Sequence, residues 1–160
     1  MTLRGATRLQ AAALILNAIT IFICCVAIAL PEQIARLADP AVVWSTSEVA
    51  IPAVALFPGI CSALFTLICL IMMTHCHSVF GSKAVVIVAV ILLVGLAFFG
   101  LMLIGFYQSL FLNGDAGALE ASAALDNAAY LLTSPFSFAA QVCSLISLGA
   151  FYGKGEARAA

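Results

Sequence analysis

The densest cluster of metal-binding residue types in the chain is His75-Cys76-His77. Imidazole and thiolate groups bind zinc, but a structural zinc site takes four ligands. The chain has no other histidine, and Glu156 is the one acid we expect on the same face. A transmembrane haem would need histidines on two facing helices, whereas these two lie within one turn. We therefore expect interfacial histidines here, and neither a metal site nor a cofactor.

The six cysteines lack the spacing of a redox site. They are Cys24, Cys25, Cys61, Cys69, Cys76 and Cys143. No two of them form a C-x-x-C motif, and none lies in segments 31–48 or 113–128, where a disulfide framework would be expected outside the cytoplasm. Thiols within apolar segments usually serve as packing residues. Cys76 follows an apolar run and is the candidate for S-palmitoylation.

Amides and hydroxyls are the only polar groups deep in the apolar runs. Asn17 is the deepest amide, and we expect it to bond to a neighbouring helix rather than to a ligand. Near the C-terminus, small and polar residues recur at helical spacing and predict a packing seam. They are Ser137, Ala140, Gln141, Ser144 and Ser147. Small residues let membrane helices approach closely, and hydroxyls can bond across the contact. A solute pathway is the alternative interpretation of both features.

No acid, base or histidine lies in the middle of any apolar run. Proton- and ion-coupled transporters generally carry such a group at membrane depth. The sequence also lacks a phosphate-binding loop, a nucleophile motif and a carboxylate pair. We therefore expect a protein that is not an enzyme.

The composition requires lipid as the solvent for most of the surface. The 160 residues are 65% hydrophobic and 8% charged, and the mean hydropathy is +1.23. Soluble domains carry about 25% charged residues. The sequence has no basic tract, so we expect no nucleic-acid partner. The lipid bilayer is the first expected partner.

Four apolar runs are long enough to cross the roughly 30 Å of hydrocarbon in a bilayer. They cover residues 11–30, 49–74, 84–112 and 129–152. Only helices satisfy the backbone of such runs in lipid. The sequence predicts an all-α fold, a single transmembrane domain over 1–160 built as a four-helix bundle. Segment 31–38 predicts a further short interfacial helix, because proline at a helix start precedes two apolar residues.

Basic residues concentrate on one face of this topology. Five of the six basic residues fall in the two tails and in loop 75–83, whereas loops 31–48 and 113–128 carry only Arg36 and six acids. Lysine and arginine in short loops mark the cytoplasmic side. Both termini are therefore expected in the cytoplasm, at the plasma membrane or an endomembrane. A mitochondrial inner membrane is an alternative, with the basic face in the matrix.

The first run is also compatible with a cleaved signal peptide. Arg4 and Arg8 precede it, and Ala27-Ile28-Ala29 resembles a cleavage site. The run is longer than the apolar core of a normal signal peptide. We therefore expect it to be retained as a membrane anchor, with cleavage as the alternative.

Two functions remain compatible with the sequence. The preferred hypothesis is a non-catalytic four-span protein that organises a membrane or serves as an accessory subunit of a membrane complex, with other membrane proteins or itself as partners. The alternative is a small transporter or channel subunit that acts as an oligomer. Pro58, expected to kink the second helix, bears on that alternative because a kink can open a cavity.

Overall fold

The computed structural model describes residues 2–41, 50–76, 87–91 and 116–159. Every regular element in these segments is a helix, so the predicted all-α class is confirmed for this part of the chain. Most of the third predicted run, 84–112, lies outside the described residues. Of that run, only the helical turn at 87–91 is described.

Five elements, together with the helical turn at 87–91, make up the described chain. They are α1 (Leu3–Ala29), α2 (Pro31–Ala38), α3 (Ala50–Ile71), the π-helical turn η1 (Met72–Cys76) and α5 (Ala116–Ala159). Helix α1 begins eight residues before its apolar run, and α5 extends beyond its run at both ends. The short helix predicted for segment 31–38 is present as α2.

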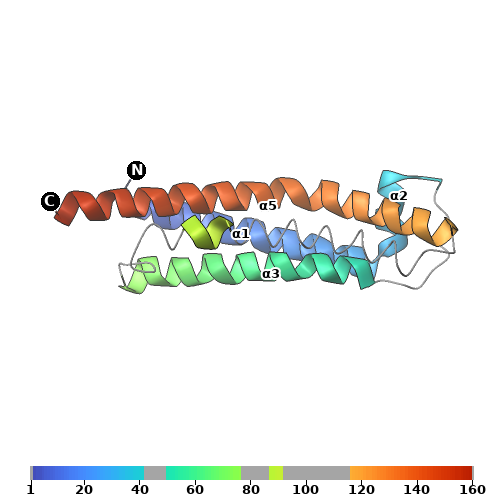
Figure 1. The fold of residues 1–160 in the computed structure, drawn as a ribbon, viewed down its shortest axis with the longest axis horizontal. Helices are drawn as coiled ribbons and strands as arrows, with labels where there is room; N and C mark the ends of the chain where they lie inside the picture. The colour runs from blue at the N-terminus through green and yellow to red at the C-terminus, as the bar shows by residue number, and fades with distance from the viewer. Residues whose placement is uncertain (1, 42–49, 77–86, 92–115, 160) are drawn as a thin grey trace.

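The long helices lie side by side in an elongated bundle (Figure 1). Helix α1 packs along both α3 and α5, and both of these run antiparallel to it. The start of α1 and the end of α5 therefore lie at one end of the bundle, and α2 lies at the other end, against α5. Because α1 packs against both α3 and α5, it is the central helix of the described fold.

Local chemistry explains where α1 and α2 begin and end. Thr2 caps α1, because its hydroxyl accepts the backbone N–H of Gly5 at 3.1 Å. The helix ends at Ala29, and its C-cap residue Leu30, which precedes Pro31, adopts φ −132° and ψ 57°. Pro31 then starts α2 at the position where proline is best tolerated. An ion pair between Glu32 and Arg36 spans one turn of α2.

Helix α5 is much longer than a bilayer crossing requires. Its 44 residues extend about 66 Å at 1.5 Å per residue, whereas a whole bilayer measures about 40–45 Å. The helix continues through Pro135, which is exposed on its surface. Its first turns lie beside α2, where Ala124, Leu125 and Ala128 pack against Ile34. The N-terminal end of α5, beside α2, therefore extends past the C-terminal end of α1.

Two helices of the described chain are long and apolar enough to cross a membrane, Leu3–Ala29 and Ala123–Gly153. In the most apolar part of each helix, the share that is buried inside the protein is only 28% and 22%, respectively. The core helix of a soluble protein would be mostly buried, so these helices lack the burial of such a core. A shorter apolar helix covers Gly59–His75.

Candidate polar site between helices α1, α3 and α5

Several polar side chains lie in the interior of the bundle beside apolar ones, and many large apolar side chains are exposed on its outside. Gln10, Asn17 and Thr66 are among the largest fully buried side chains, each at most 2% exposed. By contrast, Phe22 is 67% exposed and Phe138 is 70% exposed. Burial of polar groups is favourable only where they are hydrogen-bonded. The partners of these interior groups are therefore the central feature of the site.

Asn17 of α1 pairs with two hydroxyl residues of α3. Its Nδ2 donates to Oγ1 of Thr66 at 3.2 Å, and its Oδ1 accepts from Oγ of Ser62 at 3.0 Å. The Thr66 hydroxyl in turn donates to the backbone carbonyls of Ser62 and Ala63. Both ends of the Asn17 amide are thus bound to protein groups, and the residue joins α1 to α3.

Gln10 lies two turns before Asn17 and contacts both neighbouring helices. Its Nε2 donates to Oγ of Ser144 on α5 at 3.1 Å and to the backbone carbonyl of Thr66 on α3 at 3.4 Å. One turn further toward the start of α1, Oγ of Ser147 donates to the carbonyl of Ala6 at 2.7 Å. Hydrogen bonds through Thr66 therefore connect Asn17, Gln10 and Ser144 across all three helices.

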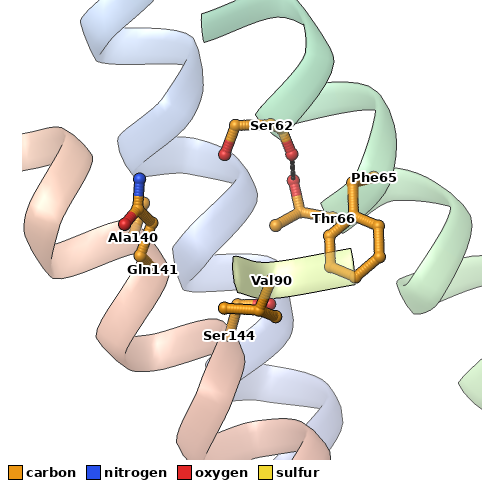
Figure 2. A pocket seen from close by; sticks show the side chains of 7 residues that line it. All are labelled: Ser62, Phe65, Thr66, Val90, Ala140, Gln141 and Ser144. Atoms are coloured by element: carbon orange, nitrogen blue, oxygen red, sulfur yellow. Dashed lines mark hydrogen bonds between the residues drawn. The ribbon is translucent and has the colours of Figure 1, made fainter. Parts of the chain in front are cut away.

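A small cavity adjoins this network (Figure 2). Side chains of α3 line one side of it, side chains of α5 line the other, and Val90 closes it from the turn at 87–91. The lining residues are Ser62, Phe65, Thr66, Val90, Ala140, Gln141 and Ser144. Its volume of about 10 Å³ is close to the minimum of about 10–15 Å³ needed to hold one water molecule.

Two buried polar atoms of the described chain have no hydrogen-bond partner, Oε1 of Gln10 and the hydroxyl of Tyr152. The Gln10 side chain is completely buried. Its Oε1 belongs to the amide whose nitrogen contacts Ser144 and Thr66. An unpaired buried acceptor costs about 1–3 kcal/mol, so Gln10 differs from Asn17, whose oxygen and nitrogen both have partners.

The residues singled out from the sequence occupy different environments. Asn17, Ser144 and Ser147 are buried, with the hydrogen bonds given above, whereas Ser137 and Gln141 are half-buried. The backbone of α3 is helical through Pro58, whose side chain lies outside the described set, so the predicted kink stays a prediction. The side chain of Cys76, at the end of η1, also lies outside it.

Three residues of the network were not singled out as site residues by the sequence. Gln10 precedes the first apolar run, beside the basic residue Arg8, and so looks like part of the polar tail. Ser62 and Thr66 are isolated hydroxyls in an apolar helix. Their four-residue spacing, which matches one helical turn, is the one signal that points to a shared face.

The described residues contain no group of three histidine, cysteine or acidic side chains that could hold a metal ion. His75 is exposed on η1, and His77 lies outside the described residues. The described cysteines, Cys24, Cys25, Cys61, Cys69 and Cys143, are free thiols. The groups that these segments do gather are neutral amides and hydroxyls, which form hydrogen bonds and carry no charge at neutral pH.

Comparisons with models of protein families, with curated proteins and with solved structures found no match to this chain.

Proposed function

We propose that this chain is a multi-pass membrane protein with four spans, which organises other membrane proteins or serves as an accessory subunit of a membrane complex. The observation that carries the proposal is the distribution of side chains in the bundle. Interior amides and hydroxyls are largely committed to contacts between helices, and large apolar side chains face outward. A protein built in this way offers its outer apolar surface to lipid or to other spans.

The polar interior supports a structural role for the bundle. Hydrogen bonds between membrane helices contribute about 0.6 kcal/mol each on average, so several of them together give modest but directional stabilisation. The bonds of Asn17 and Gln10 connect α1 to both neighbouring helices. They fix how the helices are rotated against one another and thereby which apolar faces point outward.

Charge distribution supports cytoplasmic termini. Arg4 and Arg8 are exposed at the start of α1. The last turns of α5, whose sequence includes Lys154 and Arg158, lie at the same end of the bundle. The opposite end carries α2, whose Glu32 and Arg36 pair with each other. The excess of basic residues at the first end favours its placement in the cytoplasm.

The test is purification of the tagged protein from its own cells in mild detergent, followed by native mass measurement and identification of bound chains. The proposal predicts a stoichiometric association with larger membrane proteins. A defined homo-oligomer that carries no other chain contradicts it.

A transport role is the second candidate, and the cavity between α3 and α5 is the observation that favours it. Four of its seven lining residues carry amides or hydroxyls: Ser62, Thr66, Gln141 and Ser144. A volume near that of one water molecule is too small for most solutes, so a pathway would have to form between several copies of the chain. Flux assays on the purified oligomer in liposomes test this role, and the absence of flux for ions and small solutes would exclude it.

A further inference from the structure

We propose that the phosphate group of an anionic phospholipid binds between the guanidinium groups of Arg4 and Arg8, on the outward face of α1. The acyl chains of this lipid lie along the exposed apolar side chains that follow on the same face. The site rests on the membrane location proposed above, and it goes beyond the organising role because it assigns a ligand class to two named residues.

Arg4 and Arg8 point away from the interior of the bundle. Ala6 and Gln10 are completely buried and mark the inward face of α1 at this level. Each arginine precedes one of them by two residues, which is a rotation of about 200° around the helix axis. Both arginines are accordingly exposed, so their guanidinium groups can meet a ligand that approaches from outside the bundle.

The two arginines lie one turn apart on this face, so their side chains are neighbours. Two like charges at this spacing repel each other, and an anion bound between them removes the repulsion. The planar guanidinium group matches phosphate oxygens with parallel hydrogen bonds. Arg4 also lies in the first turn of α1, where the free N–H groups of the helix favour a negative charge.

Neither arginine pairs with an acidic side chain of the described part of the chain. The only ion pair among the described residues joins Arg36 to Glu32 on α2, at the opposite end of the bundle. Arg36 therefore has its counter-charge within the protein. The charges of Arg4 and Arg8 are left for an anion from the surroundings.

The length of α1 places these arginines at the level of the lipid headgroups. The rise from Arg8 to Ala29, the last residue of the helix, is about 32 Å, which is close to the roughly 30 Å of hydrocarbon in a bilayer. Arg4 lies about 6 Å further out, within the headgroup layer. A phosphate that is part of a lipid therefore lies at the same depth as the two guanidinium groups.

The outward face of α1 is apolar beyond the arginines. Ile15 and Phe22 follow Arg8 at intervals of seven residues, which is close to two turns, so both lie on the same face. Ile15 is 62% exposed and Phe22 is 67% exposed. One phospholipid thus meets charged partners and apolar surface on one continuous face, whereas a soluble anion uses only the arginines.

The test is the number of lipids that the full chain retains. The protein is reconstituted into vesicles of equal parts phosphatidylglycerol and phosphatidylcholine, extracted in mild detergent, and its native mass is measured. The proposal predicts retention of phosphatidylglycerol in preference to phosphatidylcholine, and equal retention of the two overturns it. Glycerol phosphate, which has the charged group without acyl chains, should not displace the lipid. Displacement by an equal concentration of glycerol phosphate overturns the assignment to a lipid.

A matched set of variants tests the two arginines. Arg4→Gln and Arg8→Gln should each lower the preference for phosphatidylglycerol about fivefold, the contribution of one basic residue at an anionic membrane surface, and the double variant should lower it further. Arg36→Gln removes a charge that is already paired with Glu32 and should leave the preference unchanged. An unchanged preference in the double variant, or an equal loss in Arg36→Gln, overturns the site.

The same measurement separates this site from the role proposed above. A chain that does not enter the vesicles contradicts the membrane location, and the lipid site with it. A chain that enters them and retains both lipids equally contradicts the lipid site alone. The vesicles contain no other protein, so the organising role is tested separately by the chains that co-purify from cells.

Discussion

Asn17 and Thr66 are 49 residues apart in the sequence and are joined by a hydrogen bond of 3.2 Å between Nδ2 and Oγ1. The same amide accepts a second bond from Ser62. Because the two α3 residues lie one turn apart, a single side chain of α1 is held against one face of α3. This contact fixes the rotation and the register of the two helices.

Replacement of Asn17 by leucine should therefore destabilise the bundle. The variant loses two bonds between helices at about 0.6 kcal/mol each, so we expect a loss of about 1 kcal/mol in the free energy of unfolding. Unfolding in mixed micelles, followed by circular dichroism, measures this difference. Asn127→Leu is the matched control, because Asn127 is exposed on α5 and should be nearly neutral. Equal effects of the two variants would show that the contact contributes nothing specific.

The close contact between α1 and α3 at Gly59 predicts a steric effect. A β-carbon added at Gly59 would lie 3.5 Å from Cγ1 of Ile21 and 4.0 Å from Cγ2 of Thr20. That leaves room for alanine, but leucine should push the helices apart at a cost of about 1–3 kcal/mol in the free energy of unfolding.

Gly149→Leu is the control for this substitution. A β-carbon at Gly149 meets nothing within 4 Å, so the larger side chain projects into open space. Thermal unfolding of both variants in detergent should show a lower midpoint for Gly59→Leu alone. A normal midpoint for Gly59→Leu would contradict the packing of α1 on α3.

The hydrogen bonds of α1 lead us to predict that this helix is retained in the mature protein. Cleavage after Ala29 would remove Gln10 and Asn17 and leave Ser62, Thr66 and Ser144 without the partners described above. We expect the protein purified from its membrane to keep α1, and intact-mass measurement checks this directly. A mass that corresponds to a chain starting at Leu30 or Pro31 would establish the signal-peptide interpretation instead.

The topology predicts opposite accessibility for α2 and for the two ends of the chain. In a cysteine-free background, Arg36→Cys should react with a membrane-impermeant thiol reagent added to intact cells, because Arg36 is exposed on α2. Cysteines placed at Arg4 and Arg158 should react only after the membrane is opened. Labelling of all three positions from outside, or of the ends alone, would contradict the proposed orientation.

Sequence periodicity is informative for α5. Ser144 and Ser147 stand out by their spacing, and both lie in the contact with α1. Small residues are recognisable in a membrane helix because most other positions are large and apolar. Hydrophobicity alone does not define the ends of α5, since the helix extends into less apolar sequence on both sides.

Which residues form hydrogen bonds with one another inside the bundle is decided by how the helices pack in three dimensions. Apart from the hydroxyls of Ser62 and Thr66, both the outer and the interior faces of α3 are apolar, so its sequence gives little indication of which face meets α1. Gln10 illustrates a second difficulty, because a glutamine two residues from an arginine is expected in solvent. It is buried because α3 and α5 cover this side of α1.

The most direct test of the organising role is the composition of the complex that the protein forms in its own membrane. Tagged protein is extracted in mild detergent, its native mass is measured, and the bound chains are identified and quantified. The proposed role predicts a mass larger than that of the chain alone, with other membrane proteins present in fixed ratio. A homo-oligomer without other chains, active in flux assays after reconstitution, would contradict it and would establish the transport role instead.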